Sequence, residues 1–166
     1  MEIHRVDFII SGGQTGADRA GLDVARSLGI RHSGWCPKGR RAEDGVIPAH
    51  YELKETESGD YQERTKLNIV QSNVTLLFTL SEKLTPGSRL TMQTAARVGR
   101  PLLWIPTTVG EPIHHVASIL GFINHFTPSV VNVAGSRESK SPGIGEHTRS
   151  ILTMALGSKD GQNPAT

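Results

Sequence analysis

The chain has 166 residues, of which 36% are hydrophobic and 20% charged, and its net charge is +2. This composition is typical of one globular domain, and the small net charge excludes a strongly basic nucleic-acid-binding protein as the default. A single cysteine excludes a disulfide framework and a multi-thiolate zinc site. No apolar run reaches the roughly 20 residues of a membrane helix, and the first residues contain no apolar signal segment. We therefore expect a cytoplasmic protein that does not span a membrane.

Short apolar segments alternate with helical patterns along the chain. Strands are predicted over residues 6–10, 30–36, 74–80, 101–105 and 130–133. Helical patterns begin near residues 17, 60, 88 and 112, and the last lies within 142–156. This order predicts right-handed βαβ units and a mainly parallel sheet of about five or more strands, covered by helices on both faces. We expect one domain over residues 1–156, followed by a flexible tail over 157–166.

The first loop, residues 11–19, joins the first strand to the first helix and is rich in glycine. A helix N-terminus offers free N–H groups and a partial positive charge, so we predict an anion site on the amides of Gly13 to Ala17. The alternative is a tight turn that simply needs glycine. Asp18, in the first helical turn, is equally compatible with stabilising the helix dipole and with accepting hydrogen bonds from a ligand.

The longest irregular stretch, residues 37–59, contains a short run of cations. Lys38, Arg40 and Arg41 precede Glu43 and Asp44 directly, so the run could be a self-neutralising surface loop. Alternatively, the two arginines and the lysine form a clamp for an anion. Composition alone favours the surface loop.

Three further features carry polar groups to places where a ligand could bind. Tyr61, Arg64, Thr65 and Asn68 share one helix face, which is either a hydrogen-bonding stripe or the solvated side of the helix. Residues 85–91 form a second strand-to-helix turn in which Ser88 is predicted to cap the helix. Residues 134–139 follow the fifth strand and bring another cation, Arg137.

Other chemistry finds less support in the sequence. The seven histidines show no metal-binding spacing, so we expect no metal ligands. Cys36 has no histidine near it in sequence and is expected to be a buried thiol.

Three motifs resemble those of the molybdenum carrier family, which includes molybdenum cofactor carrier proteins. They are SGGQTGADRA at 11–20, GWCPKGRRAEDG at 34–45 and VAGSRESKSPG at 133–143. The resemblance extends to about residue 156 and implies a Rossmann-like fold similar to that of the lysine-decarboxylase-like, or LOG-type, proteins. It also implies the binding of molybdenum cofactor (molybdopterin), a pterin with a phosphate and an oxo-molybdenum centre, or of a molybdate-like anion.

The resemblance also implies the positions that contact the ligand. They are Gly12, Gly13, Gln14, Thr15, Gly16, Lys38, Gly39, Arg40, Arg41, Ser88, Thr91, Arg137, Glu138 and Ser139. Asp18 is added as a cofactor-binding candidate, and the clamp interpretation of Lys38, Arg40 and Arg41 gains over the surface loop. Ser136 stands where the family usually has proline.

One departure separates this chain from the LOG-type hydrolases, whose motif is PGGxGTxxE. Here Ser88 and Leu90 replace the later glycines, and Thr94 stands at the glutamate position. Without that carboxylate no acid or base is evident for N-glycosidic hydrolysis, so we predict no catalytic residue and binding rather than catalysis. The alternatives are a nucleotide-binding or nucleotide-processing LOG-type enzyme (phosphoribohydrolase-like) and a nucleotide sensor.

The expected partners are a small anionic ligand and further copies of the chain. The resemblance implies a homo-oligomer, a dimer or tetramer, and hand-over of the cofactor to molybdoenzymes. Neither nucleic acid nor a membrane is expected as a partner.

Overall fold

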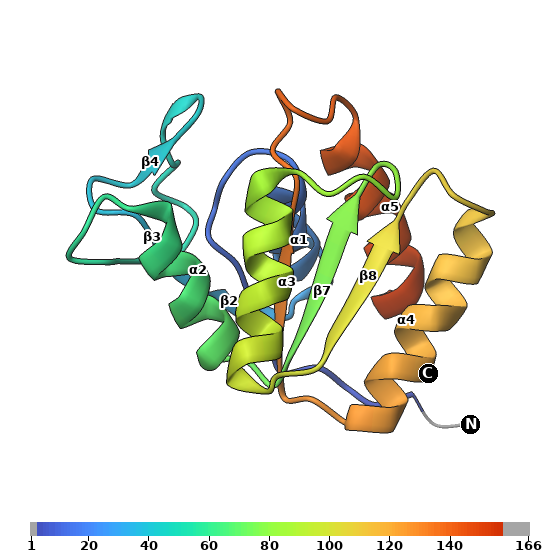
Figure 1. The fold of residues 1–166 in the computed structure, drawn as a ribbon. Coiled ribbons are helices and arrows are strands. Elements are labelled where there is room, and N and C mark those ends of the chain that lie inside the picture. The colour runs from blue at the N-terminus through green and yellow to red at the C-terminus, as the bar shows by residue number, and fades with distance from the viewer. Residues whose placement is uncertain (1–2, 158–166) are drawn as a thin grey trace.

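The computed structural model describes residues 3–157, and a five-stranded sheet lies at its centre (Figure 1). The strands of this sheet are β1 (Phe8–Ile10), β2 (Arg31–Ser33), β7 (Val74–Thr79), β8 (Leu102–Pro106) and β9 (Val130–Gly135). Their spatial order is β2-β1-β9-β7-β8, and every neighbouring pair is parallel. The predicted parallel sheet is confirmed.

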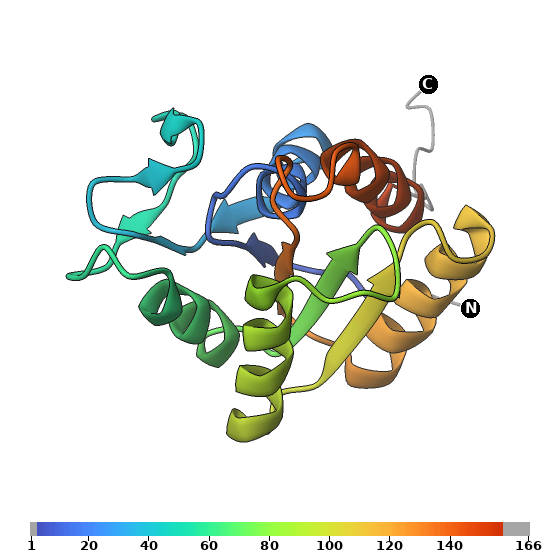
Figure 2. The same ribbon diagram turned by 45° about the horizontal axis from the view of Figure 1, so that its top comes forward.

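Helices cover both faces of the sheet (Figure 2). They are α1 (Ala17–Leu28), α2 (Tyr61–Val70), α3 (Pro86–Val98), α4 (Pro112–Phe126) and α5 (Ile144–Leu156). Helix α5 packs against both α1 and α4 on one face, and α2 packs against α3 on the other. The fold is therefore a three-layer α/β sandwich of the Rossmann-like type, as predicted.

The strand order is that of a doubly wound sheet whose first strand has moved to the end of the chain. If β9 and α5 preceded β1, the spatial order would read 3-2-1-4-5, the first five strands of the Rossmann order. The reversal point of such a sheet lies between β9 and β7, because α5 follows β9 on one face and α3 follows β7 on the other. Ligands of open α/β proteins bind at this point, outside the carboxyl ends of the strands.

The main core surrounds the central strands. All six residues of β7 are buried, and Leu76 and Phe78 are completely shielded from solvent together with Ile9 of β1. A smaller apolar cluster of Leu22, Cys36, Ile47 and Tyr51 lies outside this core. It anchors the segment 37–59 to α1.

The segment 37–59 is more ordered than the sequence predicted. The expected second strand breaks at Gly34, where φ is 141° and a Cβ would lie 2.0 Å from the carbonyl oxygen of Ser11. The chain continues as β3 (Trp35–Cys36), which pairs with β6 (Lys54–Glu55). Between them β4 (Arg41–Ala42) and β5 (Gly45–Val46) form a short hairpin. A local sequence pattern cannot reveal these two-residue strands.

The helix caps differ from prediction in one place. Asp60 caps α2 by accepting a hydrogen bond from the amide of Gln62, in agreement with the helical pattern predicted to begin near residue 60. The cap of α3 is Thr85 and not Ser88, because the Thr85 hydroxyl accepts from the Ser88 amide and the helix already begins at Pro86. Proline is favourable in a first helical turn, where its missing N–H costs nothing. The tail predicted for 157–166 lies outside the described residues from 158 onward.

Candidate ligand-binding site

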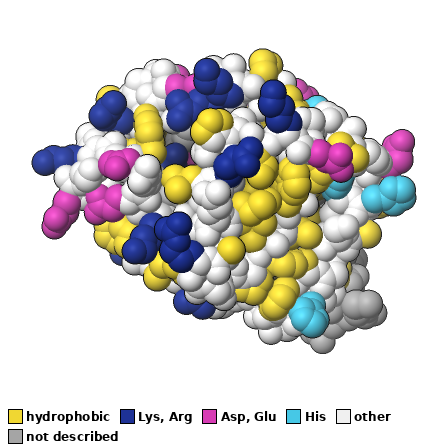
Figure 3. Space-filling model, in the orientation of Figure 1, with side chains coloured by type: hydrophobic (Ala, Val, Ile, Leu, Met, Phe, Trp, Pro, Cys, Tyr) yellow, Lys and Arg dark blue, Asp and Glu magenta, His cyan; other side chains and the backbone are white. Residues whose placement is uncertain are grey.

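A cavity of about 360 Å³ lies at the reversal point of the sheet, within the range of small-molecule sites. Its walls come from the α1 loop, α2, the start of α3 and the end of β9. The lining residues are Gly12, Gln14, Asp18, Tyr61, Arg64, Thr65, Asn68, Thr85, Pro86, Gly87, Leu90, Thr91, Asn132, Ala134, Gly135, Arg137 and Lys140. Lys and Arg side chains gather along the upper part of the molecular face that Figure 3 shows.

A buried ion pair forms one wall of this cavity. Arg64 Nη1 donates to Asp18 Oδ2 at 2.8 Å, and the two residues are only 9% and 6% exposed. Burial raises the pKa of the Asp18 carboxyl, and the charge and hydrogen bond of Arg64 oppose that rise. The guanidinium lies so close to Gly12 that a Cβ there would be 1.5 Å from Nη1. Gly12 is therefore required for close packing of a side chain, and not for its own conformation.

Two buried donors beside the ion pair lack partners. Neither Arg64 Nε nor Gln14 Nε2 has a hydrogen-bond partner among the described residues. The Gln14 side chain is held in place because its Oε1 accepts from the amides of Thr15 and Glu43. An unpaired buried donor costs about 1–3 kcal/mol, a cost that an acceptor in the cavity would relieve.

Another part of the lining is basic and partly apolar. Arg137 and Lys140, both in the loop after β9, line the cavity. The guanidiniums of Arg137 and Arg64 lie 5.5 Å and 5.3 Å from the centre of the Tyr61 ring. Gly87, in the first turn of α3, adds the end of a helix dipole that favours an anion.

The polar stripe on α2 proves to be part of this cavity. Tyr61, Arg64, Thr65 and Asn68 all line it, so the stripe is not simply the solvated face of the helix. Asn68 also joins α2 to β3, since its side chain accepts from the Trp35 amide and donates to the Trp35 carbonyl. Helical spacing alone could show that these residues share a face, but not what that face meets.

Four of the five predicted amides at the start of α1, all except that of Gly16, have hydrogen-bond partners inside the protein. Four such hydrogen bonds are formed, from Gly13 to Ser11 Oγ, from Gln14 to Asp18 Oδ2, from Thr15 to Gln14 Oε1 and from Ala17 to the Ser136 carbonyl. Gly16, which has a positive φ, packs against the Ser136 carbonyl, where a Cβ would be 2.4 Å away. These four amides are thus engaged within the protein, and the loop brings the side chains of Gln14 and Asp18 to the cavity.

The cations of the second loop do not line the cavity. Lys38 and Arg41 are exposed, and the Gly39 amide donates to Glu55. The Arg40 guanidinium is used within its own segment, where it donates to the backbone carbonyls of Ile47, Pro48 and Tyr51. The structure therefore does not bring Lys38, Gly39, Arg40 or Arg41 to the cavity, and a charge run read in sequence could not show this.

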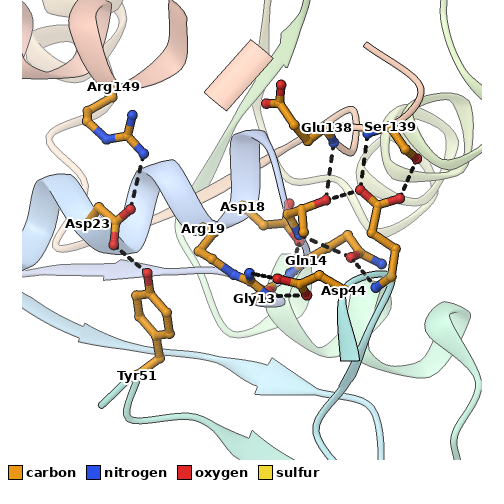
Figure 4. A network of polar contacts seen from close by, with 12 residues as sticks. Gly13, Gln14, Asp18, Arg19, Asp23, Asp44, Tyr51, Glu138, Ser139 and Arg149 are labelled. Atoms are coloured by element: carbon orange, nitrogen blue, oxygen red, sulfur yellow. Dashed lines mark hydrogen bonds and ion pairs between the residues drawn. The ribbon is translucent and has the colours of Figure 1, made fainter. Parts of the chain in front are cut away.

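The acidic residues of that segment tie it to the rest of the site (Figure 4). Glu43 accepts hydrogen bonds from the Thr15 hydroxyl and from the amide and hydroxyl of Ser139. Burial acts to raise the pKa of Glu43, but these hydrogen bonds outweigh it and hold that pKa below its ordinary value. Asp44 pairs with Arg19 at 2.5 Å. The hairpin thus holds the α1 loop and the loop that carries Arg137.

Some of the remaining predicted residues line the cavity, and the others form hydrogen bonds within the loops and helix ends around it. Thr91 and Arg137 line the cavity, with Gly12, Gln14 and Asp18 of the first loop. Ser88 is buried beside Thr85, which donates to its hydroxyl. Glu138 caps α5 by accepting from the amides of Gly143 and Gly145, and its own amide donates to Thr15.

Neither a metal site nor a membrane-spanning helix is found within residues 3–157. There, no group of three or more His, Cys, Asp or Glu side chains is placed to hold a metal ion. None of the helices in this range is both long and apolar enough to cross a membrane. Cys36 is buried, and burial raises the pKa of its thiol.

Fold and cavity together define a doubly wound α/β protein with a cavity at the reversal point of its sheet, lined by Arg64, Arg137 and Lys140. Over residues 9–156 the chain matches the family described as cpYpsA, the circularly permutated YpsA SLOG family, and it belongs to that family. The strand order described above is consistent with that permutation.

A solved structure extends the comparison. The chain is similar to the crystal structure of a "Putative molybdenum carrier protein" from Syntrophus aciditrophicus SB, with 38% identity and a TM-score of 0.91. The match covers 93% of this chain and 98% of the other. No curated protein matches the chain.

Proposed function

We propose that this protein is a cytoplasmic carrier that binds the molybdenum cofactor, or a related phosphorylated pterin, in the cavity between α2, α3 and the loop after β9. The observation that carries the proposal is the distribution of charge in the cavity. Its lining contains Arg64, Arg137 and Lys140 against one carboxylate, Asp18, which is itself paired with Arg64. A pocket of this polarity suits a small anion attached to a polar ring system.

The lining residues fit the chemistry of such a cargo. Arg137, Lys140 and the first turn of α3 would hold the phosphate, since guanidinium, ammonium and helix N-terminal amides are its usual partners. Tyr61, Pro86 and Leu90 offer apolar surface for the faces of the pterin ring. The bound cofactor would contain the oxo-molybdenum centre that the protein carries.

Binding without turnover is supported by the state of the available carboxylate. Among the residues described as lining the cavity, Asp18 is the only acid. It is ion-paired with Arg64, and these lining residues contain no second carboxyl group to complete the acid–base pair that hydrolysis of a glycosidic bond uses. The position of the LOG-type glutamate is occupied by Thr94, which is buried on α3. These features favour a carrier over a nucleotide hydrolase.

The carrier role includes two further expectations. The cofactor would be passed on to molybdoenzymes, which requires a cavity from which it can leave. The lining of the cavity includes the exposed side chain of Lys140, so the cavity reaches the protein surface there. The protein would act as a homo-oligomer, a dimer or tetramer. An edge strand, β8, with partly exposed Leu102, Leu103 and Trp104 supports this arrangement. Light scattering that gives the mass of one chain at micromolar concentration would contradict it.

Mass spectrometry of the protein purified without oxygen tests the proposal. Native spectra of the intact protein should show a bound species that releases a phosphorylated pterin on denaturation, with molybdenum in metal analysis. Cells unable to make the cofactor provide the control, and protein from them should lack this species. A bound nucleotide in both preparations, with no pterin in either, would contradict the carrier function.

A further inference from the structure

We infer that the cavity recognises a lactam edge, the adjoining ring N–H and C=O that pterins and guanine share and that adenine lacks. This inference deepens the proposed function, on which it rests for the phosphate end of the ligand, and it names the chemical class of the other end.

The starting point is a carboxylate in an otherwise basic pocket. Asp18 lines the cavity, and its Oδ2 accepts from Arg64 Nη1 at 2.8 Å and from the Gln14 amide at 3.4 Å. Its other oxygen, Oδ1, accepts no hydrogen bond from the described residues. A carboxylate in the wall disfavours an anion directly beside it, because like charges repel. The Oδ1 atom of Asp18 can instead accept a hydrogen bond from a ligand that donates one.

Donors without partners lie next to this acceptor. Arg64 Nε and Gln14 Nε2 are both buried and unpaired, and Arg64 also pairs with Asp18. The wall of the cavity thus combines one carboxylate oxygen that can accept with two groups that can donate. A ring carbonyl beside a ring N–H is the complement of that pattern.

The pattern discriminates between nucleobases. The 2-amino-4-oxo edge of a pterin, like the equivalent edge of guanine, presents donors to a carboxylate and a carbonyl to donors. The corresponding edge of adenine presents a ring nitrogen lone pair and an amine. That lone pair would face the Asp18 carboxylate, and Arg64 and Gln14 would remain unpaired. The apolar surfaces of Pro86 and Leu90 leave room for the faces of either ring, so the edge decides.

Calorimetry with nucleotides that differ only at this edge tests the inference. GMP and AMP share ribose and phosphate, and 6-hydroxymethylpterin monophosphate supplies the same edge on a pterin. We expect GMP and the pterin monophosphate each to bind at least about tenfold more tightly than AMP, as expected for one well-paired edge against a mismatched one. AMP binding as tightly as both of them, or neither of them showing measurable binding, would overturn the inference. GMP alone above AMP would assign the site to a guanine and not to a pterin edge.

A variant pair assigns the discrimination to Asp18. Asp18→Asn should reduce the preference of GMP over AMP to less than about threefold, and the matched control Asp7→Asn, an exposed acid outside the cavity that is bonded to Ser129, should preserve it. An unchanged preference in folded Asp18→Asn would overturn the inference. If that variant fails to fold, the wild-type ratio alone decides. Bound molybdenum cofactor without a preference for GMP over AMP would refute the lactam site and leave the carrier function standing. A preference for GMP without bound cofactor would refute the carrier function and leave the lactam site standing.

Discussion

The contact between Gly12 and Arg64 makes a direct prediction about stability. In Gly12→Ala the new Cβ would lie 1.5 Å from Arg64 Nη1, 2.6 Å from Cζ and 2.9 Å from Cδ. The guanidinium cannot swing away freely, because it is buried and bonded to Asp18 at 2.8 Å. The substitution therefore forces a choice between a steric clash and a weakened ion pair.

The expected cost follows from these distances. Overpacking of a tight interior costs about 1–3 kcal/mol, and complete loss of one partner of a buried ion pair costs about 3–5 kcal/mol. Since Arg64 is displaced and not removed, we expect the lower part of this range, about 2 kcal/mol. For a chain of this length that corresponds to a fall in Tm of about 4–8 °C. Ligand binding should weaken as well, because Arg64 lines the cavity.

Thermal and urea unfolding measure this effect, with Gly121→Ala as the matched control. Gly121 lies within α4, and nothing lies within 4 Å of a Cβ built there. Alanine at that site should raise stability by up to about 1 kcal/mol, because glycine is unfavourable within helices. If Gly12→Ala is as stable as the wild type, the close packing of Arg64 on Gly12 is wrong. A change in stability equal to that of the control would lead to the same conclusion.

Three further predictions concern single side chains. Burial and the hydrogen bond to Asp23 raise the pKa of Tyr51 to about 12. Phenolate absorbance from Tyr51 should therefore appear only near pH 12 and be absent in Tyr51→Phe. A Tyr51 titration midpoint near 10 would contradict this. Cys36 is the only cysteine, is buried and has a raised pKa, so thiol reagents at pH 8 should label it at least tenfold more slowly than in the unfolded chain; equal rates would refute the buried assignment. The folded pKa of Glu43 lies below its ordinary value of 4.5, so the stability that Glu43 adds is complete above about pH 4.5 and is lost as pH falls through the folded pKa. The advantage of the wild type over Glu43→Gln in urea should thus shrink between pH 7 and pH 3, and a constant difference would contradict the contacts with Ser139.

The sequence predicted the sheet well because its signals are local. The buried strand β7 appears as an apolar run, and Gly99 ends α3 with the left-handed backbone that such a position predicts. Helical spacing also placed Tyr61 and Arg64 on one face of α2. What that face meets depends on α2 packing against α3 and on the position of β9, the last strand of the chain, at the centre of the sheet. No local pattern contains that information.

The site was predicted only in part for the same reason. The sequence left two roles open for Asp18. Its ion pair with Arg64 joins residues 46 positions apart in the chain, so local sequence could not reveal it. Lys38 and Arg41 match a family motif and are exposed outside the cavity, while Lys140, which does line it, gave no signal of its own. Charge patterns predict that cations are near one another in the chain, and only the fold determines which of them share a pocket.

Binding of molybdopterin to a set of cation variants tests the central claim most directly. We expect Arg137→Ala to weaken binding about 10- to 100-fold, since a charge-assisted hydrogen bond to phosphate contributes about 1.5–3 kcal/mol, and Lys140→Ala, which is more exposed, to weaken it less. Lys38→Ala and Arg41→Ala, matched cations outside the cavity, should stay within about twofold of the wild type. Anaerobic calorimetry at two salt concentrations measures all four. The account would be contradicted if Arg137→Ala bound like the wild type while Lys38→Ala or Arg41→Ala lost affinity.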